Sequence, residues 1–282
     1  MKLDRQAYLI FDGAMGTMLQ KNGLNPGQPP EVFNMTRPEV IGEIYREYIK
    51  AGSQVITTNT FGALEGKIKP TGYSVEEVIQ SAVAIARKAA GSQLVALDIG
   101  PTGELLEPIG DVTFEEAYEL FARQVKAAAI TGEVDLVLIE TFFDLEEARA
   151  AIQAVKDHSS LPVICTFTFQ KQGKTMMGYD VETVATALAE YGADGIGINC
   201  SVGPSEMLPF VETLVNSTQL PILVQPNAGL PKIVDGQTVY DIEPQEFARF
   251  IKAMADLGVK WFGGCCGTTP EFIRAIRKVL SE

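Results

Sequence analysis

Short apolar runs rich in β-branched residues recur along the chain, and each is followed by a longer segment with apolar residues spaced three and four apart. The runs cover residues 8–12, 54–59, 94–98, 135–140, 163–168, 195–200, 222–225 and 259–263. Most are almost continuously apolar, which is typical of parallel strands covered on both faces. The pattern therefore predicts eight buried parallel strands.

The segments between these runs predict eight helices. They cover residues 38–49, 75–90, a segment that begins at 113, and residues 145–157, 181–191, 205–216, 244–257 and 270–280. Gly52, Gly192 and Gly258 stand at predicted helix ends, where glycine is the preferred cap. The segment from Thr113 to Glu116 has the spacing of a capping box. Eight alternating strands and helices predict a (β/α)8 barrel that occupies residues 1–282 as a single domain.

Enzymes with this fold carry their chemistry at the C-terminal ends of the strands. Cys200 lies at the end of the sixth predicted strand, and Cys265 and Cys266 lie at the end of the eighth. The predicted barrel therefore places three thiols on one rim. Cys165 lies in the middle of the fifth predicted strand, where it is interpreted as a small core residue.

The adjacent cysteines predict a metal site if the backbone bends between them. Neighbouring side chains of an extended strand point to opposite faces, so Cys265 and Cys266 converge only at a bend, which the flanking glycines permit. The single histidine, His158, lies at a predicted helix end and surface turn. A bound transition metal would therefore be held mainly by sulfur. Three thiolates on zinc leave one position open, and a substrate thiol that enters it becomes a thiolate.

Three other interpretations of the cysteines remain open. They pack as small apolar residues, they belong to a structural zinc with a fourth protein ligand, or they form a redox disulfide. Four cysteines in 282 residues are too few for a disulfide framework.

The charge and hydropathy of the chain limit its partners. A net charge of −13 argues against nucleic acid and anionic membranes, because both require a basic surface. Apolar runs are shorter than the roughly 18 residues that span a membrane. The first residues also lack the pattern of a secretory signal. We therefore expect a cytoplasmic protein with no membrane or nucleic-acid partner.

Seven motifs, in order over nearly the whole chain, resemble those of the homocysteine S-methyltransferases. They are Phe11-Asp-Gly-Ala-Met-Gly-Thr17, Thr58-Asn-Thr-Phe-Gly62, Asp98-Ile-Gly-Pro-Thr-Gly103, Leu138-Ile-Glu-Thr-Phe142, Gly197-Ile-Asn-Cys-Ser201, Gln225-Pro-Asn-Ala-Gly229 and Gly263-Gly-Cys-Cys-Gly-Thr-Thr-Pro-Glu271. The resemblance implies a (β/α)8 barrel that binds homocysteine and holds zinc through Cys200, Cys265 and Cys266.

Two motifs bear on the methyl donor. The segments at 98–103 and 226–229 resemble the homocysteine-binding module of cobalamin-dependent methionine synthase. This resemblance implies a folate-derived methyl group delivered as methylcobalamin by a corrinoid-binding partner or module. Betaine-using relatives carry a tyrosine metal ligand where this chain has Phe61, which counts against betaine. Two alternatives remain. In the first, the enzyme transfers the methyl group directly from S-methylmethionine or S-adenosylmethionine. In the second, the protein is a non-catalytic subunit that binds thiol or zinc.

The charges of homocysteine point to further site residues. Asp12 and Glu140 are the expected partners of its ammonium, by resemblance and because both stand at strand ends. No strand end presents Arg or Lys, so the turns at Gly13-Ala14 and Thr60-Phe61 are expected to bind the carboxylate through backbone N–H groups. Asn199 is expected in the substrate site, where it orients the ligands, and Asn227 as a fourth zinc ligand without substrate. For Asp98, a role in the site and a simpler role as a helix cap or a solvated carboxylate explain the sequence equally well.

Overall fold

The apolar runs of the sequence form a parallel sheet that closes on itself. The computed structural model describes residues 7–234 and 237–281. Within these residues, eight parallel strands pair in the order β1-β10-β7-β6-β5-β4-β3-β2, and a bridge between Phe11 and Val55 joins the two ends of the sheet. The strands are β1 (Leu9–Ile10), β2 (Val55–Thr57), β3 (Leu94–Ile99), β4 (Leu136–Phe142), β5 (Val163–Phe167), β6 (Gly195–Asn199), β7 (Ile222–Gln225) and β10 (Trp261–Phe262). The predicted barrel is confirmed.

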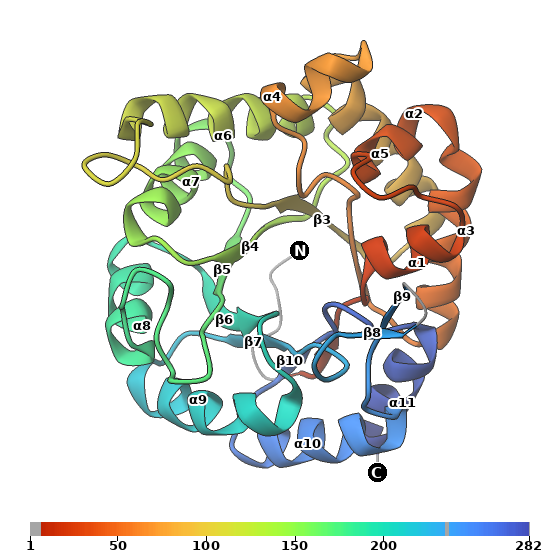
Figure 1. Ribbon diagram of the computed structural model, residues 1–282, viewed down its shortest axis with the longest axis vertical. Coiled ribbons are helices and arrows are strands. Elements are labelled where there is room, and N and C mark those ends of the chain that lie inside the picture. The colour runs from red at the N-terminus through yellow and green to blue at the C-terminus, as the bar shows by residue number, and fades with distance from the viewer. Residues whose placement is uncertain (1–6, 235–236, 282) are drawn as a thin grey trace.

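The predicted helices surround the ring of strands (Figure 1). They are α3 (Pro38–Ala51), α5 (Val75–Ala90), α6 (Phe114–Ala129), α7 (Leu145–His158), α8 (Val181–Glu190), α9 (Pro204–Ser217), α10 (Pro244–Asp256) and α11 (Pro270–Ser281). The capping box of Thr113 and Glu116 forms at the start of α6, and Ser74 and Glu77 form a second one at α5. Gly52, Gly192 and Gly258 all have positive φ, as predicted for caps.

Several short elements were not predicted, and they follow β1, β2 and β7. They are α1 (Met15–Lys21), η1 (Pro30–Val32), α2 (Phe33–Thr36), α4 (Glu65–Ile68), η2 (Lys69–Thr71) and the antiparallel pair β8 (Lys232–Val234) and β9 (Gln237–Val239). Each is too short to show a period in the sequence. These additions enlarge the loops at the C-terminal ends of the strands.

The barrel has two apolar layers because successive strand residues face opposite sides. Phe11, Leu138, Leu223 and Trp261 belong to the cluster that fills the interior. A larger cluster lies between strands and helices, and Cys165 is fully buried in it, which confirms its predicted place in the core. His158 ends α7, half-buried, with Nε2 3.1 Å from the Tyr118 hydroxyl. None of the described helices has the length and apolar character to cross a membrane.

Candidate functional site

The two adjacent cysteines lie in a tight turn directly after β10. The amide and the hydroxyl of Thr268 both donate to the Cys265 carbonyl, at 3.1 and 2.7 Å. Gly267 completes the turn with a φ of +83°, a conformation that glycine adopts without strain. Gly264 has no room for a side chain, since a Cβ there would lie 2.4 Å from Thr268 Oγ1. The bend that the flanking glycines predicted is therefore present.

Cys200 reaches the same place from the end of β6. It has a left-handed backbone with a φ of +60°. The end of β7 lies between the two cysteine segments and bonds to both: the Cys200 amide donates to the Gln225 carbonyl at 3.1 Å, and the Cys265 amide donates to the Pro226 carbonyl at 2.9 Å. Three strands of the barrel thus fix the positions of the three thiols.

The geometry of the three thiols fits a tetrahedral metal. Their Sγ atoms all lie within 4.8 Å of one another, and the Sγ atoms of Cys200 and Cys266 are 3.9 Å apart. Two sulfurs bound to one tetrahedral zinc would be separated by about 3.8 Å, given a Zn–S bond of about 2.3 Å. The three half-buried cysteines therefore form a cluster that can bind a metal.

The three thiols lie close enough to change one another's acidity. Hydrogen bonds from Cys200 and Cys265 lower the pKa of the Cys266 thiol to about 3. The pKa of Cys265 is raised well above its usual value, first by its hydrogen bonds to Cys200 and Cys266. Zinc binds thiolates, so a metal at this cluster would displace the remaining thiol protons.

Three acidic side chains stand near the C-terminal ends of β1, β3 and β4. Asp12 is 2% exposed, its oxygens accept from the Thr57 amide at 2.9 Å and hydroxyl at 2.6 Å, and burial raises its pKa to about 7. Burial, and then the charge of Cys200, raise the pKa of Glu140 to about 8. Burial, and then Glu140, raise the pKa of Asp98 well above its usual range. Crowded acids of this kind favour a bound cation.

Asp98 is neither a solvated carboxylate nor a helix cap. Asp98 is 7% exposed and lies within β3. Its backbone amide donates to the Thr58 hydroxyl at 3.0 Å. The cap of α6, the next helix, is Thr113. Both simpler interpretations of Asp98 are therefore wrong.

Asn199 lies beneath this rim with its side chain fully buried. Its Oδ1 accepts from the Thr141 amide at 2.9 Å and the Thr166 hydroxyl at 2.8 Å. Its Nδ2 donates to the Thr141 hydroxyl at 2.7 Å and lies 3.9 Å from Cys265 Sγ. Asn199 therefore connects a cysteine of the cluster to the residue that follows Glu140, but it does not line the cavity described next.

A cavity of about 820 Å³ opens over the barrel mouth and joins these groups. A volume in this range is typical of small-molecule sites. The predicted residues that line it are Asp12, Gly13, Ala14, Glu140, Cys200, Cys265 and Cys266. The acids and the thiols therefore face one common space.

Three predicted residues have other roles in the structure. Thr60 does not line the cavity; its amide donates to the Thr58 carbonyl at 2.9 Å and its hydroxyl to the Asp98 carbonyl at 2.7 Å. The Ala14 amide donates to Thr268 Oγ1 at 3.2 Å. Asn227 is 4% exposed and lies outside the cavity lining, but its Oδ1 has no hydrogen-bond partner among the described residues.

Sequence reasoning missed two residues of the site. Thr57 donates hydrogen bonds to both carboxylate oxygens of Asp12. Its position near the end of a predicted strand is a signal from which this role could have been predicted. Tyr240 follows β9, and its ring packs against Gly267, the residue after Cys266. It lies in a segment without periodicity, so its sequence position gave no indication of this contact.

The chain is similar over nearly its whole length to proteins of known sequence. Methionine synthase of Mycobacterium tuberculosis (strain ATCC 25618 / H37Rv) is 31% identical over 98% of this chain, and methionine synthase of Mycobacterium leprae (strain TN) is 30% identical over 98%. The chain spans about a quarter of the length of these relatives.

Solved structures give the same relationship. The metallated form of the homocysteine methyltransferase MmuM from Escherichia coli superposes with a TM-score of 0.83 at 26% identity, covering 98% of this chain and 97% of that one. Its apo form superposes with a TM-score of 0.77. A family model described as homocysteine S-methyltransferase matches residues 9–280. The chain belongs to the homocysteine S-methyltransferase family.

Proposed function

We propose that this barrel binds zinc through Cys200, Cys265 and Cys266 and methylates the sulfur of homocysteine to form methionine. The observation that carries the proposal is the convergence of three thiols, at a separation suited to zinc, beside acids in one cavity. Bound zinc would keep the substrate sulfur as a thiolate near neutral pH. We further infer a cytoplasmic enzyme, because the three cysteines must stay reduced to hold a metal.

The remaining steps belong to the side chains around the cavity. Asp12 and Glu140 bind the substrate ammonium, and their charged forms are favoured once that cation is present. The amides of Ala14 and Thr60 already have partners, which leaves Gly13 and Phe61 as the proposed donors to the substrate carboxylate. Held at both ends, the substrate has its sulfur directed to the cysteine cluster. Asn227, with its unpartnered Oδ1, is the proposed occupant of the fourth metal position without substrate.

For the methyl donor we favour methylcobalamin carried by a partner protein or another module. The support is the identity of 30–31% to methionine synthases over nearly the whole chain. The open mouth of the cavity suits a donor that docks from outside the barrel. Phe61 lines the cavity at the position where betaine-using relatives have a tyrosine ligand, so we do not propose betaine.

A specific observation supports a sulfonium donor as the second candidate. Four acidic residues line the cavity, namely Asp12, Glu31, Asp98 and Glu140, against one lysine, Lys67. Burial raises the pKa of all four acids, and cations in the cavity favour their charged forms. A sulfonium such as S-methylmethionine or S-adenosylmethionine would bring a second positive charge beside the substrate ammonium.

A donor screen on the zinc-loaded protein with homocysteine tests the proposal. We expect methionine, measured by mass spectrometry, with methylcobalamin, and none from the metal-free protein. Turnover with a sulfonium and none with methylcobalamin would establish the second candidate instead. Binding of homocysteine in calorimetry without methyl transfer from any donor would contradict both and indicate a non-catalytic binding subunit.

A further inference from the structure

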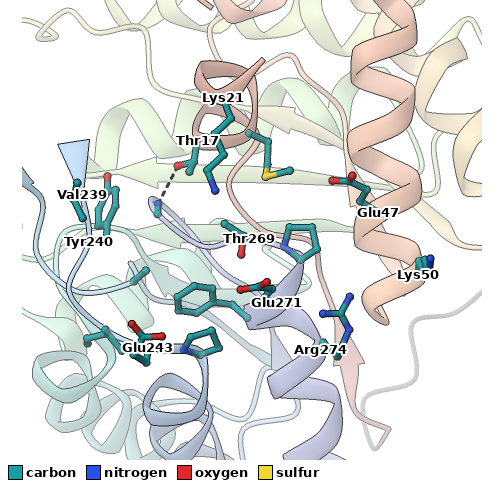
Figure 2. Close-up of a pocket in the computed structure, with 17 residues that line it drawn as sticks. Thr17, Lys21, Glu47, Lys50, Val239, Tyr240, Glu243, Thr269, Glu271 and Arg274 are labelled. Carbon is teal, nitrogen blue, oxygen red and sulfur yellow. Dashed lines mark hydrogen bonds between the residues drawn. The ribbon is translucent and has the colours of Figure 1, made fainter. Parts of the chain in front are cut away.

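Buried polar side-chain atoms without a hydrogen-bond partner occur in the substrate cavity but not in the neighbouring cleft. That cleft, of about 760 Å³, is shown in Figure 2, where the dashed line marks the 3.0 Å bond from the Gly267 amide to Thr17 Oγ1. None of its described lining residues has such an atom. Three residues of the substrate cavity do, namely Glu31, Asp98 and Gln225. Among these three side chains, that of Glu31 alone also forms a hydrogen bond with a described residue.

The Glu31 side chain joins the loop after β1 to the loop after β2. Glu31 is 2% exposed, and its Oε1 accepts from the Gly62 amide at 2.6 Å. The approach is close, since a Cβ on Gly62 would lie 2.9 Å from Oε1. Asn59 Nδ2 donates to the Pro30 carbonyl at 2.9 Å, and Asn34 Nδ2 donates to the Asn59 carbonyl at 2.8 Å. The two loops are therefore bonded together on both sides of Glu31.

The turn at residues 60–63 has one backbone polar group without a partner among the described residues. Glu31 binds the Gly62 amide. The other bonded groups are the Thr60 amide with the Thr58 carbonyl, the Thr60 carbonyl with the Ala63 amide, the Phe61 carbonyl with the Gly100 amide, the Gly62 carbonyl with the Leu64 amide, and the Ala63 carbonyl with Gln124 Nε2. The group that remains is the N–H of Phe61, a residue that lines the substrate cavity.

The peptide groups on both sides of Phe61 are held in place. The peptide between Phe61 and Gly62 is planar, and its two polar groups point in opposite directions. Gly100 binds its carbonyl at 3.0 Å and Glu31 binds its amide at 2.6 Å. The Phe61 ring also packs on Gly100, where a Cβ would lie 2.6 Å from Cε2. Because the Thr60 carbonyl is bonded too, the direction of the Phe61 N–H is fixed.

We propose that Glu31 is a positioning residue for the substrate carboxylate: it holds the Phe61–Gly62 peptide so that the Phe61 N–H points into the cavity. This role rests on the proposed function, in which the Phe61 amide binds that carboxylate. An apolar side chain at position 31 would avoid the cost of the unpartnered Oε2, so Glu31 is better explained by what its Oε1 holds in place. The bond from Gly62 requires an acceptor oxygen and not a charge.

The test compares methionine with 3-methylthiopropylamine, which is methionine without its carboxylate. Glu31→Leu removes the acceptor for Gly62, and we expect the affinity of the zinc-loaded protein for methionine, measured by calorimetry, to fall by about 10-fold. Its affinity for the amine and its zinc content should not change. Glu31→Gln keeps an acceptor oxygen and should restore the binding of methionine.

Gly62→Ala tests the same contact from the other side. Its added Cβ would lie 2.9 Å from Oε1 and displace the Glu31 carboxyl, so it should cause the same selective loss even if Glu31→Leu does not fold. Glu147→Leu is the matched control. Glu147 is also buried, its Oε1 accepts from the Thr102 amide at 2.7 Å, and its Oε2 has no partner among the described residues, but it does not line the cavity. It should lower stability without changing the preference for methionine over the amine.

Three results would overturn the positioning role. They are an unchanged affinity for methionine in both Glu31→Leu and Gly62→Ala, an equal loss of affinity for methionine and the amine, and a failure of Glu31→Gln to restore binding. The proposed function would stand in each case, because the wild type would still bind zinc and methionine. Wild-type protein that binds neither would contradict the proposed function and this inference together.

Discussion

Asn199 and Thr141 exchange two hydrogen bonds at the rim of the barrel. The Thr141 amide donates to Asn199 Oδ1 at 2.9 Å, and Asn199 Nδ2 donates to the Thr141 hydroxyl at 2.7 Å. Thr141 has a φ of +64°, which is strained for a β-branched residue. Because the same amide group lies 3.9 Å from Cys265 Sγ, one side chain fixes both the segment of Glu140 and a proposed metal ligand.

Asn199→Ala should therefore impair substrate binding more than a single lost contact would suggest. Without Asn199, Thr141 loses the two hydrogen bonds that hold it in its strained conformation, and the neighbouring Glu140 carboxylate becomes less precisely placed. We expect KM for homocysteine to rise by about 10-fold, with a smaller fall in kcat, and the free energy of unfolding to fall by about 1–3 kcal/mol. Steady-state kinetics and urea unfolding measure the two effects. Asn216→Ala, on the exposed face of α9, is the control, and an equal change there would contradict the prediction.

The three rim cysteines should behave as one unit. Cys200→Ser, Cys265→Ser and Cys266→Ser should each lose zinc, from near one per chain to well below it, together with methyl transfer, because a thiolate is a stronger zinc ligand than an alcohol. Metal content is measured by atomic absorption on the purified chain. Cys165→Ala is the matched control, since Cys165 is buried away from the cluster and should affect stability alone. Full activity in metal-free protein would refute the zinc mechanism.

The meeting of Cys200 with Cys265 and Cys266 could be predicted because the fold determines it. Apolar runs located the strands, the strands located their ends, and parallel strands bring their ends to one rim. Asp12 and Glu140 were found by the same argument. The β7 carbonyls that fix the two cysteine segments follow from strand order, which the alternation of strands and helices also implies.

Contacts within the loops could not be predicted from the sequence. The Thr60 amide was expected to face substrate, but a local turn bond to Thr58 uses it. The left-handed backbone of Thr141 opposes the preference of a β-branched residue and is held by a partner 58 positions away. Tyr240 packs on Gly267, next to Cys266, at the end of a hairpin too short to show periodicity. In each case a tertiary contact overrides the local signal.

The capping box at α6 offers a stability prediction that is separate from the site. Thr113 Oγ1 accepts from the Glu116 amide at 3.2 Å, and Glu116 accepts from the Thr113 amide at 2.9 Å. Thr113→Ala removes one of these bonds and should lower the free energy of unfolding by about 1 kcal/mol, with activity unchanged. Thr186→Ala, in the exposed middle of α8, should change it by less than about 0.5 kcal/mol. Urea denaturation of both variants decides whether the cap contributes as expected.

The charge state of Asp12 should control binding of the substrate ammonium. The groups that face it are Thr57, Asp98, Glu140, Tyr45 and Tyr48. Thr57 stabilises the carboxylate, but burial outweighs it and raises the pKa of Asp12 to about 7. A carboxyl with a raised pKa keeps its proton up to that pH, and an ammonium pairs only with the carboxylate. Affinity for a cationic ligand should therefore fall as the pH drops below about 7, by up to about tenfold per unit.

Methionine is the suitable probe for this effect, because it has the ammonium and carboxylate of homocysteine but no thiol proton. Calorimetry on the zinc-loaded protein between about pH 6 and 8, with zinc content checked at each pH, should show weaker binding at the acidic end. Asp12→Asn should bind methionine more weakly at about pH 8 and have a shallower pH dependence, since an amide does not titrate in this range and the remaining dependence comes from Glu140, whose pKa is raised to about 8. A pH dependence that persists unchanged in Asp12→Asn would assign it to another group and remove Asp12 from the ammonium site.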